Sequence, residues 1–329
     1  METLERAELC FPHLLNTSCR KPKPPSSGAM ILHILQSFIC LLTVALNLLV
    51  IISISHYRQL HSPTNLLLLS LAASDLLVGL LVPFQILLTG ACWLLGDFMC
   101  IVYYIVDFTI ICASIGNMVL ISVDRYVAIC DPLCYNSIVS LRRVKICVCL
   151  CWICSAFYSC IILNDTLRQP GRHNSCYGEC VVVLSYVMGT VDFVVAFIGP
   201  ITVIIVLYMR VFVVAVSQAR AMRSHIVSVT LQPSGTVTAK KSELKAARTL
   251  GVVVVVFLTC LFPYYYPSLT GQETMINASF VSFEIWLFNI NSCLNPVIYA
   301  FFYPWFRKTI KLIVTLQILQ PDSCEAHIL

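Results

Sequence analysis

The chain has 329 residues, of which 59% are hydrophobic and only 11% are charged, and its mean hydropathy is +0.87. A soluble globular domain carries about 25% charged residues, so this composition excludes a disordered protein, a nucleic-acid-binding protein and most cytosolic enzymes. A helix that crosses a membrane takes about 20 mostly apolar residues, and the chain is long enough for several such helices. The net charge of +5 says less than the positions of the charges do.

Seven long apolar runs are predicted to be membrane-spanning helices, because a backbone in lipid must satisfy its own hydrogen bonds. They are much longer than strands and lack the alternation of a membrane barrel. The runs lie at about 30–55, 65–89, 98–123, 144–163, 181–209, 246–268 and 280–302. The sequence thus predicts an all-α membrane protein with an amino-terminal segment (1–29), a seven-helix bundle (30–302), and a short amphipathic helix (303–316) followed by a cytoplasmic tail that ends at 329.

Lysine and arginine residues are distributed unevenly between the connections of these runs. Fifteen of the 21 fall in the carboxyl-terminal tail or in connections on its side of the membrane, including the polar linker over 217–242. Cytoplasmic loops of membrane proteins are enriched in lysine and arginine. Anionic lipid headgroups of the inner leaflet attract these residues. The distribution therefore predicts a multi-pass protein of the cell membrane with its amino terminus outside the cell.

Two outer segments carry predicted glycosylation sites, Asn16 and Asn277, each of which begins an Asn-X-Ser/Thr triplet. Most of the 18 cysteines lie within or near predicted spans and are expected to pack as small apolar residues. Others lie in outer segments or at the outer rim, where oxidation is allowed. These are Cys10, Cys19, Cys92, Cys100, Cys176 and Cys180. No cysteine spacing is typical of a zinc site, and Cys324 in the tail is a candidate for palmitoylation or a free thiol.

Short motifs occur in a fixed order along the runs. The second run contains Leu71-Ala72-Ala73-Ser74-Asp75, the third ends with Asp124-Arg125-Tyr126, and the seventh contains Asn295-Pro296-Val297-Ile298-Tyr299. Single markers occupy the other runs, namely Asn47, Trp152, Pro200, Tyr208, Phe257 and Pro263. With this order and spacing, nearly the whole chain resembles the rhodopsin-like G-protein-coupled receptors. The stretch 291–306 is similar to the corresponding stretch of the trace amine-associated receptors.

Two carboxylates lie at membrane depth, where a charge is costly and marks a functional site. Asp107 lies seven residues after Cys100, which is the position of the amine-binding aspartate in the aminergic receptors that the chain resembles. Asp192 lies eight residues before Pro200, where catecholamine receptors often have a serine. The resemblance implies a protonated amine at Asp107, and a diamine if Asp192 holds a second cationic group. The alternatives are a neutral or helix-capping Asp107 and an Asp192 that pairs with an internal group.

The rest of the pocket is expected to be apolar with a few oriented polar groups. Tyr264 and Tyr265 are candidate aromatic walls that offer cation–π contacts, and the alternative is plain interhelical packing. Ile111, one turn below the third-helix aspartate, is the expected floor. Two positions depart from the family pattern. Leu261 replaces the tryptophan of the sixth-helix switch, and Asn289 replaces a tyrosine that hydrogen-bonds the third-helix aspartate.

Deeper polar residues resemble the sodium-linked network of this superfamily. Asp75 supplies its carboxylate, and a carboxylate in hydrocarbon needs a partner, which a sodium ion with waters would supply. The other members of the network are Asn47, Ser114, Asn291 and Asn295. The alternative is a network hydrated by water alone.

The inner face carries the residues that the resemblance links to activation and G-protein coupling. Arg125 is expected to pair with Glu243 and so to hold the third and sixth helices together until ligand binding favours their separation. The remaining residues of this set are Asp124, Tyr126, Tyr208 and Tyr299.

The resemblance further implies two disulfide bonds. One joins Cys100 to Cys180, and the second ties the amino-terminal segment to the second outer loop through Cys19 and Cys176, with Cys10 as the rival partner.

By this resemblance the chain is a receptor and not an enzyme, and it needs no cofactor beyond the sodium ion. Small trace or volatile amines are the expected ligands, a stimulatory heterotrimeric G protein that raises cyclic AMP is the expected partner, and olfaction is the expected role. An intramembrane aspartyl protease is disfavoured because the chain lacks a Gly-X-Gly-Asp element. The alternatives are an amine transporter, which would be expected to show inverted repeats, and a receptor-fold protein that has lost signalling.

Overall fold

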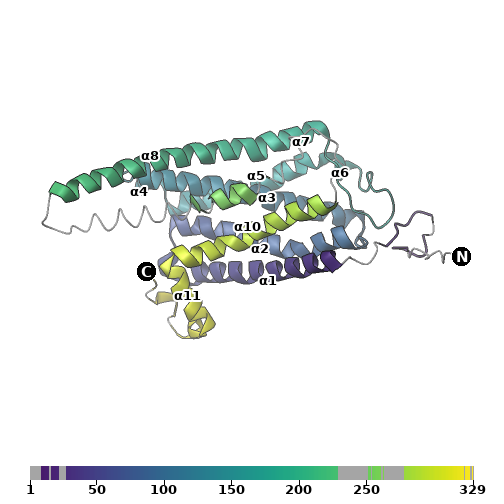
Figure 1. Cartoon of the computed structure of the whole chain (residues 1–329), viewed down its shortest axis with the longest axis horizontal. Helices are drawn as coiled ribbons and strands as arrows, with labels where there is room; N and C mark the ends of the chain where they lie inside the picture. The colour runs from purple at the N-terminus through teal and green to yellow at the C-terminus, as the bar shows by residue number, and fades with distance from the viewer. Residues whose placement is uncertain are drawn as a thin grey trace.

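The computed structural model describes residues 9–14, 16–21, 27–228, 251–252, 254–260, 262, 278–321, 323–326 and 328. Its long helices lie side by side along the long axis of the molecule (Figure 1). These are α1 (Ser27–His56), α2 (Pro63–Gly90), α3 (Gly96–Cys130), α5 (Leu141–Ile162), α8 (Gly199–Ser228) and α10 (Ala278–Phe302). A shorter helix, α7 (Tyr186–Asp192), and a π-helical segment, η2 (Phe193–Ile198), lead directly into α8.

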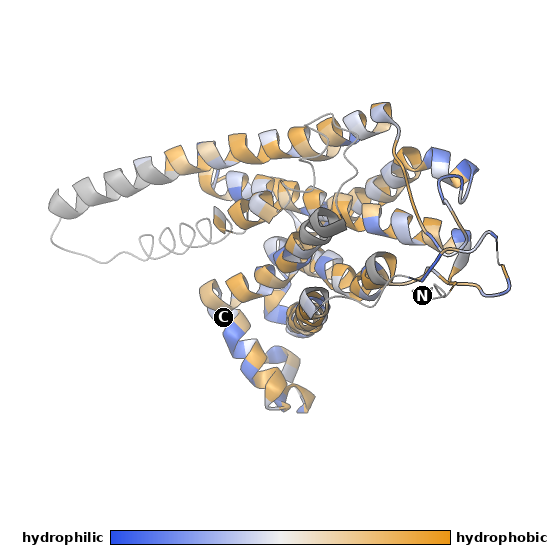
Figure 2. Ribbon diagram, turned by 45° about the vertical axis from the view of Figure 1, so that its right-hand side comes forward, coloured by the Kyte–Doolittle hydropathy of each residue, from blue (hydrophilic) through white to orange (hydrophobic). Residues whose placement is uncertain are grey.

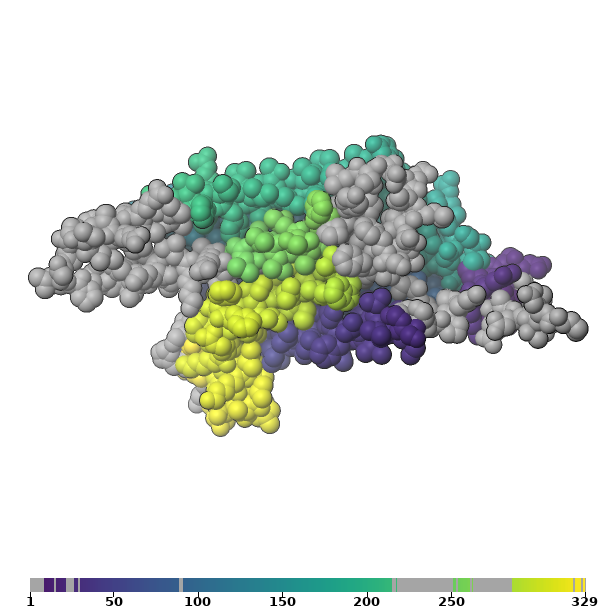
Figure 3. Space-filling view, viewed as in Figure 1, coloured from purple at the N-terminus to yellow at the C-terminus, as the bar shows by residue number. Residues whose placement is uncertain are grey.

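These helices have the dimensions of membrane spans. α1, α2, α3, α5 and the continuous segment from α7 into α8 are each long and apolar enough to cross a membrane, and α10 adds 25 residues. Within the predicted sixth span, 246–268, the described residues 251–252, 254–260 and 262 are helical and lie between α8 and α10 (Figure 3). The predicted all-α membrane bundle is confirmed.

Several helix limits differ from the predicted spans, because hydropathy marks only the part of a helix that lies in lipid. α3 continues to Cys130 rather than to 123, and α8 continues to Ser228 rather than to 209. The fifth span begins at Tyr186 rather than at 181. The reason is local: the Ser185 side chain accepts a hydrogen bond from the Met188 amide and caps α7 there.

The core follows the axis of the bundle. Leu68, Met118 and Phe257 are almost completely buried, whereas Leu41 is 69% exposed and Phe212 is 64% exposed. Apolar residues cover much of the outer faces of the long helices as well (Figure 2). An exposed apolar surface of this extent is what helices need where their outer faces meet lipid.

Three disulfide bonds define one end of the bundle, which we name the disulfide end. Cys19 is bonded to Cys176 and Cys100 to Cys180, the two pairs that the resemblance implies. Cys10, the rival partner for Cys176, is instead bonded to Cys92 in the α2–α3 connection. The amino-terminal segment is thereby fastened to two connections of the bundle.

The opposite end, which we name the α11 end, carries a helix that turns away from the bundle axis (Figure 1). α11 (Pro304–Val314) starts at a proline, whose missing N–H costs nothing at a helix start. Trp305 and Phe306 are buried, while Arg307 and Lys311 are exposed. The amphipathic helix predicted over 303–316 is therefore present with slightly shorter limits, because Leu316 adopts a left-handed conformation with φ 58°.

Short elements complete the described chain. They are η1 (Arg58–Leu60), α4 (Tyr135–Ile138), α6 (Asn164–Arg168), η3 (Gln317–Leu319) and η4 (Ser323–Glu325).

Candidate functional site

Asp107 lies on α3, about 16 Å along the helix from its first residue at Gly96. The Cys100–Cys180 bond fastens this part of α3 to the α6–α7 connection. The side chain of Asp107 is partly buried, and Ile111, one turn further along, is buried in the core. The ion pairs among the described residues join Arg58 to Glu325 and Arg125 to Asp124, so Asp107 has no internal cationic partner in this part of the chain.

Asp192 is the last residue of α7 and is 6% exposed. Its Oδ1 atom accepts a hydrogen bond from the Tyr158 hydroxyl of α5 at 2.9 Å, which gives the carboxylate a neutral partner within the bundle. The π-helical segment follows directly. Pro200 accounts for the wider turn, because proline lacks an N–H and its ring clashes with the carbonyl one turn earlier.

Tyr158 also lines a cavity of about 300 Å³ between α3, α5 and the η2–α8 segment. The lining further includes Cys112, Cys151, Cys154 and Pro200. The cavity is therefore mostly apolar, and Tyr158 contributes to it while its hydroxyl contacts the carboxylate.

Asn289 lies on α10, and its side-chain amide donates a hydrogen bond to Gln85 Oε1 on α2 at 3.0 Å. The two side chains are 1% and 5% exposed. Sequence reasoning missed Gln85, because no motif marks it. The other expected pocket residues, Tyr264 and Tyr265, and the departure Leu261 lie outside the described residues.

The expected sodium-linked residues lie in the middle of the bundle. Asp75 on α2 is 1% exposed, and its Oδ2 atom accepts a hydrogen bond from the Asn295 amide of α10 at 2.8 Å. The Asn47 amide donates to the carbonyls of Thr43 and Ser292, which ties α1 to α10. Within the described residues, four buried side-chain oxygens of this expected network lack a hydrogen-bond partner. They belong to Asn47, Ser114, Asn291 and Asn295.

These orphaned oxygens fit a cation better than a dry apolar core, because hard cations such as sodium prefer oxygen ligands. A second buried link runs across α2, α3 and α5. Trp152 donates to Ser70 at 3.0 Å, and Ser70 donates to Asn117 at 2.9 Å. Sequence reasoning noted Trp152 as a marker but missed Ser70 and Asn117, which belong to no motif.

At the α11 end, Asp124 and Arg125 form an ion pair on α3. Thr64 on α2 joins the pair: its hydroxyl donates to Asp124 at 2.9 Å and accepts from Arg125 at 2.6 Å. The Tyr135 hydroxyl donates to the other Asp124 oxygen at 2.9 Å. Burial raises the pKa of Tyr135, so its hydroxyl remains a donor at neutral pH. Glu243, the expected partner of Arg125, lies outside the described residues.

The other expected signalling residues lie on α3, α8 and α10. Tyr299 on α10 is 1% exposed, and Tyr208 on α8 is half-buried. Tyr126 packs against the apolar pair Ile129 and Val211 between α3 and α8.

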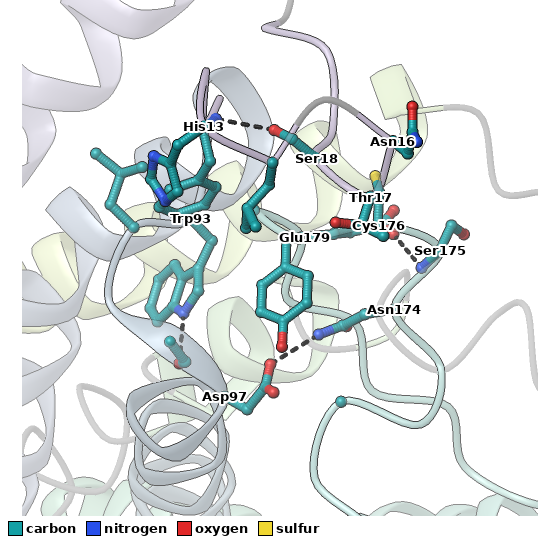
Figure 4. Close-up of a pocket in the computed structure, with 17 residues that line it drawn as sticks. His13, Asn16, Thr17, Ser18, Trp93, Asp97, Asn174, Ser175, Cys176 and Glu179 are labelled. Carbon is teal, nitrogen blue, oxygen red and sulfur yellow. Dashed lines mark hydrogen bonds between the residues drawn. The ribbon is translucent and has the colours of Figure 1, made fainter. Parts of the chain in front are cut away.

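The disulfide end contains a cavity of about 700 Å³ between the amino-terminal segment and the connections of the bundle. Figure 4 shows Asp97 and Asn174 pointing toward one another, and their hydrogen bond measures 3.0 Å. The Glu179 carboxylate accepts from the Ser175 amide at 2.7 Å. Asn16, an expected glycosylation site, is exposed and lines this cavity, whereas Asn277 lies outside the described residues.

Comparisons with known proteins agree on one family. Residues 46–299 match the family model described as 7 transmembrane receptor (rhodopsin family). The chain is 34% identical to Trace amine-associated receptor 13c of Danio rerio, with 98% of this chain and 96% of the relative covered. It is 37% identical to Trace amine-associated receptor 8b of Mus musculus, with 96% and 95% covered, and 34% identical to Trace amine-associated receptor 1 of Macaca mulatta, with 94% and 95% covered.

These matches extend over nearly the whole chain and nearly the whole of each relative. Together with the long apolar helices, they make the protein a multi-pass membrane receptor and not an enzyme. The chain belongs to the rhodopsin family of seven-transmembrane receptors and, within it, to the trace amine-associated receptors.

Proposed function

We propose that this receptor binds small protonated amines through Asp107, with its disulfide end outside the cell. The observation that carries the proposal is the pair of membrane-depth carboxylates, Asp107 and Asp192, which have no cationic partner among the described residues. Buried charges in proteins are almost always paired, so such carboxylates are suited to a cation that arrives as ligand. The names of the relatives, which refer to trace amines, support the same ligand class.

An ammonium group facing the Asp107 carboxylate gains charge-assisted hydrogen bonds in a site with little competing water. Asp192 gives the site a second anionic group, which suits a diamine with a cationic group at each end. Ile111, Tyr264, Tyr265 and Asn289 complete the proposed ligand-binding set.

Sodium is proposed as an allosteric ion at Asp75. Asn47, Ser114, Asn291 and Asn295 would surround it, and the buried oxygens without protein partners support this assignment. When bound, the ion would supply a positive charge to an otherwise isolated buried carboxylate.

The orientation rests on two independent features. Three disulfide bonds lie at one end of the bundle, and disulfides persist outside the cell rather than in the cytosol. The lysine and arginine residues lie mainly toward the other end. At that end Asp124, Arg125, Tyr126, Glu243, Tyr208 and Tyr299 are proposed to control access of a heterotrimeric G protein. A stimulatory G protein, a rise in cyclic AMP and a chemosensory role are the finer proposals.

The deciding experiment measures cyclic AMP in cells that express wild type, Asp107→Ala or Asp192→Ala, with pentylamine and 1,5-diaminopentane as probes. Asp107→Ala is expected to reduce potency for both amines by at least a hundredfold, because removing one partner of a buried pair costs about 3–5 kcal/mol. Asp192→Ala is expected to reduce potency for the diamine alone. Asp165→Ala, which removes an exposed carboxylate of α6, is the control.

Undiminished amine potency in Asp107→Ala would overturn the proposal. Two alternatives have their own signatures. A transporter would accumulate labelled amine in the cells, and a receptor that has lost signalling would bind amine, seen as a raised Tm of the purified protein, without a rise in cyclic AMP.

A further inference from the structure

Asp192 is buried and needs a fixed hydrogen-bond donor if it is to carry a charge. Within the described chain the side chain that donates to it is Tyr158, whose hydroxyl lies 2.9 Å from Oδ1. The two residues come from different helices, α5 and α7, and are 34 positions apart in the sequence. The contact therefore depends on how these helices pack and not on local sequence.

Tyr158 is itself held in place by apolar packing. Its ring packs against the buried cluster of Phe108, Ile162 and Leu163, which joins α3 to the end of α5. The neighbouring Ser159 hydroxyl lies 3.2 Å from the Thr109 hydroxyl of α3, so α5 is also tied to α3 by polar atoms. Because the ring is fixed in this way, the Tyr158 hydroxyl is held in one position and donates to a single carboxylate oxygen.

A tyrosine hydroxyl has one proton to donate, and here it is directed to one of the two carboxylate oxygens. The second oxygen, Oδ2, keeps its capacity to accept hydrogen bonds. A hydrogen bond to an ionised carboxylate favours the charged form and fixes its rotamer. The remaining oxygen is then a charged acceptor in a defined position.

We propose that Tyr158 is a positioning residue for Asp192, which holds its carboxylate charged and oriented so that the free oxygen accepts the second ammonium group of a diamine. This inference rests on the proposed amine-binding function. It adds that selectivity for diamines over monoamines is set by the Tyr158–Asp192 pair, while Asp107 serves both ligand classes.

The test compares Tyr158→Phe with wild type, using 1,5-diaminopentane and pentylamine, by cyclic AMP response and by the ligand-induced rise in Tm of the purified receptor. Tyr158→Phe keeps the ring and removes the donor. The expected result is a loss of about tenfold or more in diamine potency, with pentylamine potency changed less than threefold, because hydrogen bonds to charged groups are the stronger ones. Tyr186→Phe, an 83% exposed tyrosine of α7, is the matched control and is expected to behave as wild type.

A double-mutant cycle separates positioning from general packing. In the Asp192→Asn background, Tyr158→Phe is expected to change the ratio of diamine to monoamine potency by less than twofold, since the charge it orients is gone. An equal loss for both amines, no loss for either, or the full tenfold loss in the Asp192→Asn background would overturn the assignment of Tyr158.

A failure of the proposed amine-binding function gives a different result from a failure of the positioning role of Tyr158. If Asp107→Ala still responds to both amines with wild-type potency, the amine site itself is wrong, and the role of Tyr158 falls with it. If Asp107→Ala abolishes both responses and Tyr158→Phe has no selective effect, the amine site stands and only the positioning role is rejected.

Discussion

The middle of the bundle contains a few buried polar side chains within an otherwise apolar core. Asp75 accepts a hydrogen bond from Asn295, and buried oxygens of Ser114 and Asn291 have no partner among the described side chains. A buried carboxylate whose donors are all neutral is far from satisfied, because burying a charge is costly unless it is paired. The lack of a positive partner for this carboxylate is the physical reason for proposing a sodium ion at Asp75.

Asp75→Asn is predicted to remove the dependence of receptor stability on sodium. A ligand that binds only the folded state raises stability by RT ln(1 + [L]/Kd), so sodium at ten times its Kd adds about 1.4 kcal/mol, or roughly 2–4 °C in Tm. The measurement is the Tm of the purified receptor in sodium chloride and in potassium chloride at equal ionic strength. Asp165→Asn should keep the sodium effect, and an Asp75→Asn receptor that still gains several degrees from sodium would contradict the ion site.

Asp124→Asn is predicted to raise signalling without ligand. The asparagine keeps the shape of the side chain but removes the negative charge that pairs with Arg125. It also replaces one of the two carboxylate oxygens that accept hydrogen bonds from Thr64 and Tyr135. Losing a charge-assisted contact of about 1.4 kcal/mol in the resting state would shift the equilibrium toward the active state about tenfold. Basal cyclic AMP is the readout, normalised to surface expression. Asp131→Asn, an exposed neighbour, is the control, and basal activity at the wild-type level in Asp124→Asn would argue against a resting-state lock.

At the scale of secondary-structure elements, the sequence predicts the helices but not the contacts between them. Apolar runs predict the part of each helix that lies in lipid. They therefore give helix ends that are too early for α3 and α8, which continue beyond the membrane. Hydropathy contains no signal for the π-helical segment before Pro200 or for the Tyr158–Asp192 contact, which depend on packing between distant segments. Gln85 was missed for the same reason, since its hydrogen bond with Asn289 joins segments that are far apart in the sequence.

The cysteines show the same limit. Six cysteines at the outer rim allow many pairings, and connectivity does not follow from spacing. Cys10 and Cys92 are 82 residues apart, and their bond fastens the amino-terminal segment to the α2–α3 connection in addition to the Cys19–Cys176 bond. The third bond depends on the position of the amino-terminal segment beside the α2–α3 connection, which cysteine spacing does not encode.

Removing this third bond with Cys10→Ser and Cys92→Ser is predicted to lower Tm by roughly 5 °C or more, because a disulfide stabilises mainly by restricting the unfolded chain and long loops give the larger effects. The measurement is the thermal unfolding of the purified receptor. Cys160→Ser, which removes an exposed free thiol of α5, is expected to leave Tm unchanged. Equal Tm values for the double variant and the wild type would mean that the amino-terminal segment is not fastened by this bond.

Across the whole molecule, the polar groups form three levels along the bundle axis. Asp107 and Asp192 lie toward the disulfide end, Asp75 lies in the middle, and the Asp124–Arg125 pair lies toward the α11 end. Under the proposed function, the receptor has conformational states that differ at the Asp124–Arg125 pair. A ligand bound at Asp107 and Asp192 can signal only if it binds one of these states more tightly than the other. A helix such as α3, which carries residues of the first and third levels, is a continuous element through which both sites can bias the same equilibrium.

The carboxyl-terminal tail adds a contact at the α11 end that belongs to the whole molecule, because it joins the last described residues to the α1–α2 connection. Ser323 lies 2.9 Å from His56, the Ile328 amide donates to Gln59 Oε1 at 3.0 Å, and Arg58 pairs with Glu325 at 3.0 Å. The Arg58 and Glu325 side chains are 71% and 65% exposed, whereas Ile328 is 3% exposed. Exposed ion pairs contribute little, and burial of an apolar side chain contributes much more, so Ile328 is expected to be the main anchor.

Ile328→Asp is therefore predicted to release the tail, whereas Glu325→Ala is predicted to leave it docked. The measurement is backbone hydrogen exchange over residues 317–328 in the full-length receptor. Ile328→Asp should speed exchange there at least tenfold, since placing a charge at a buried apolar position removes the anchor and adds a desolvation cost. Glu325→Ala should change exchange less than threefold. The reverse order would show that the surface ion pair, and not the buried isoleucine, holds the tail against the α1–α2 connection.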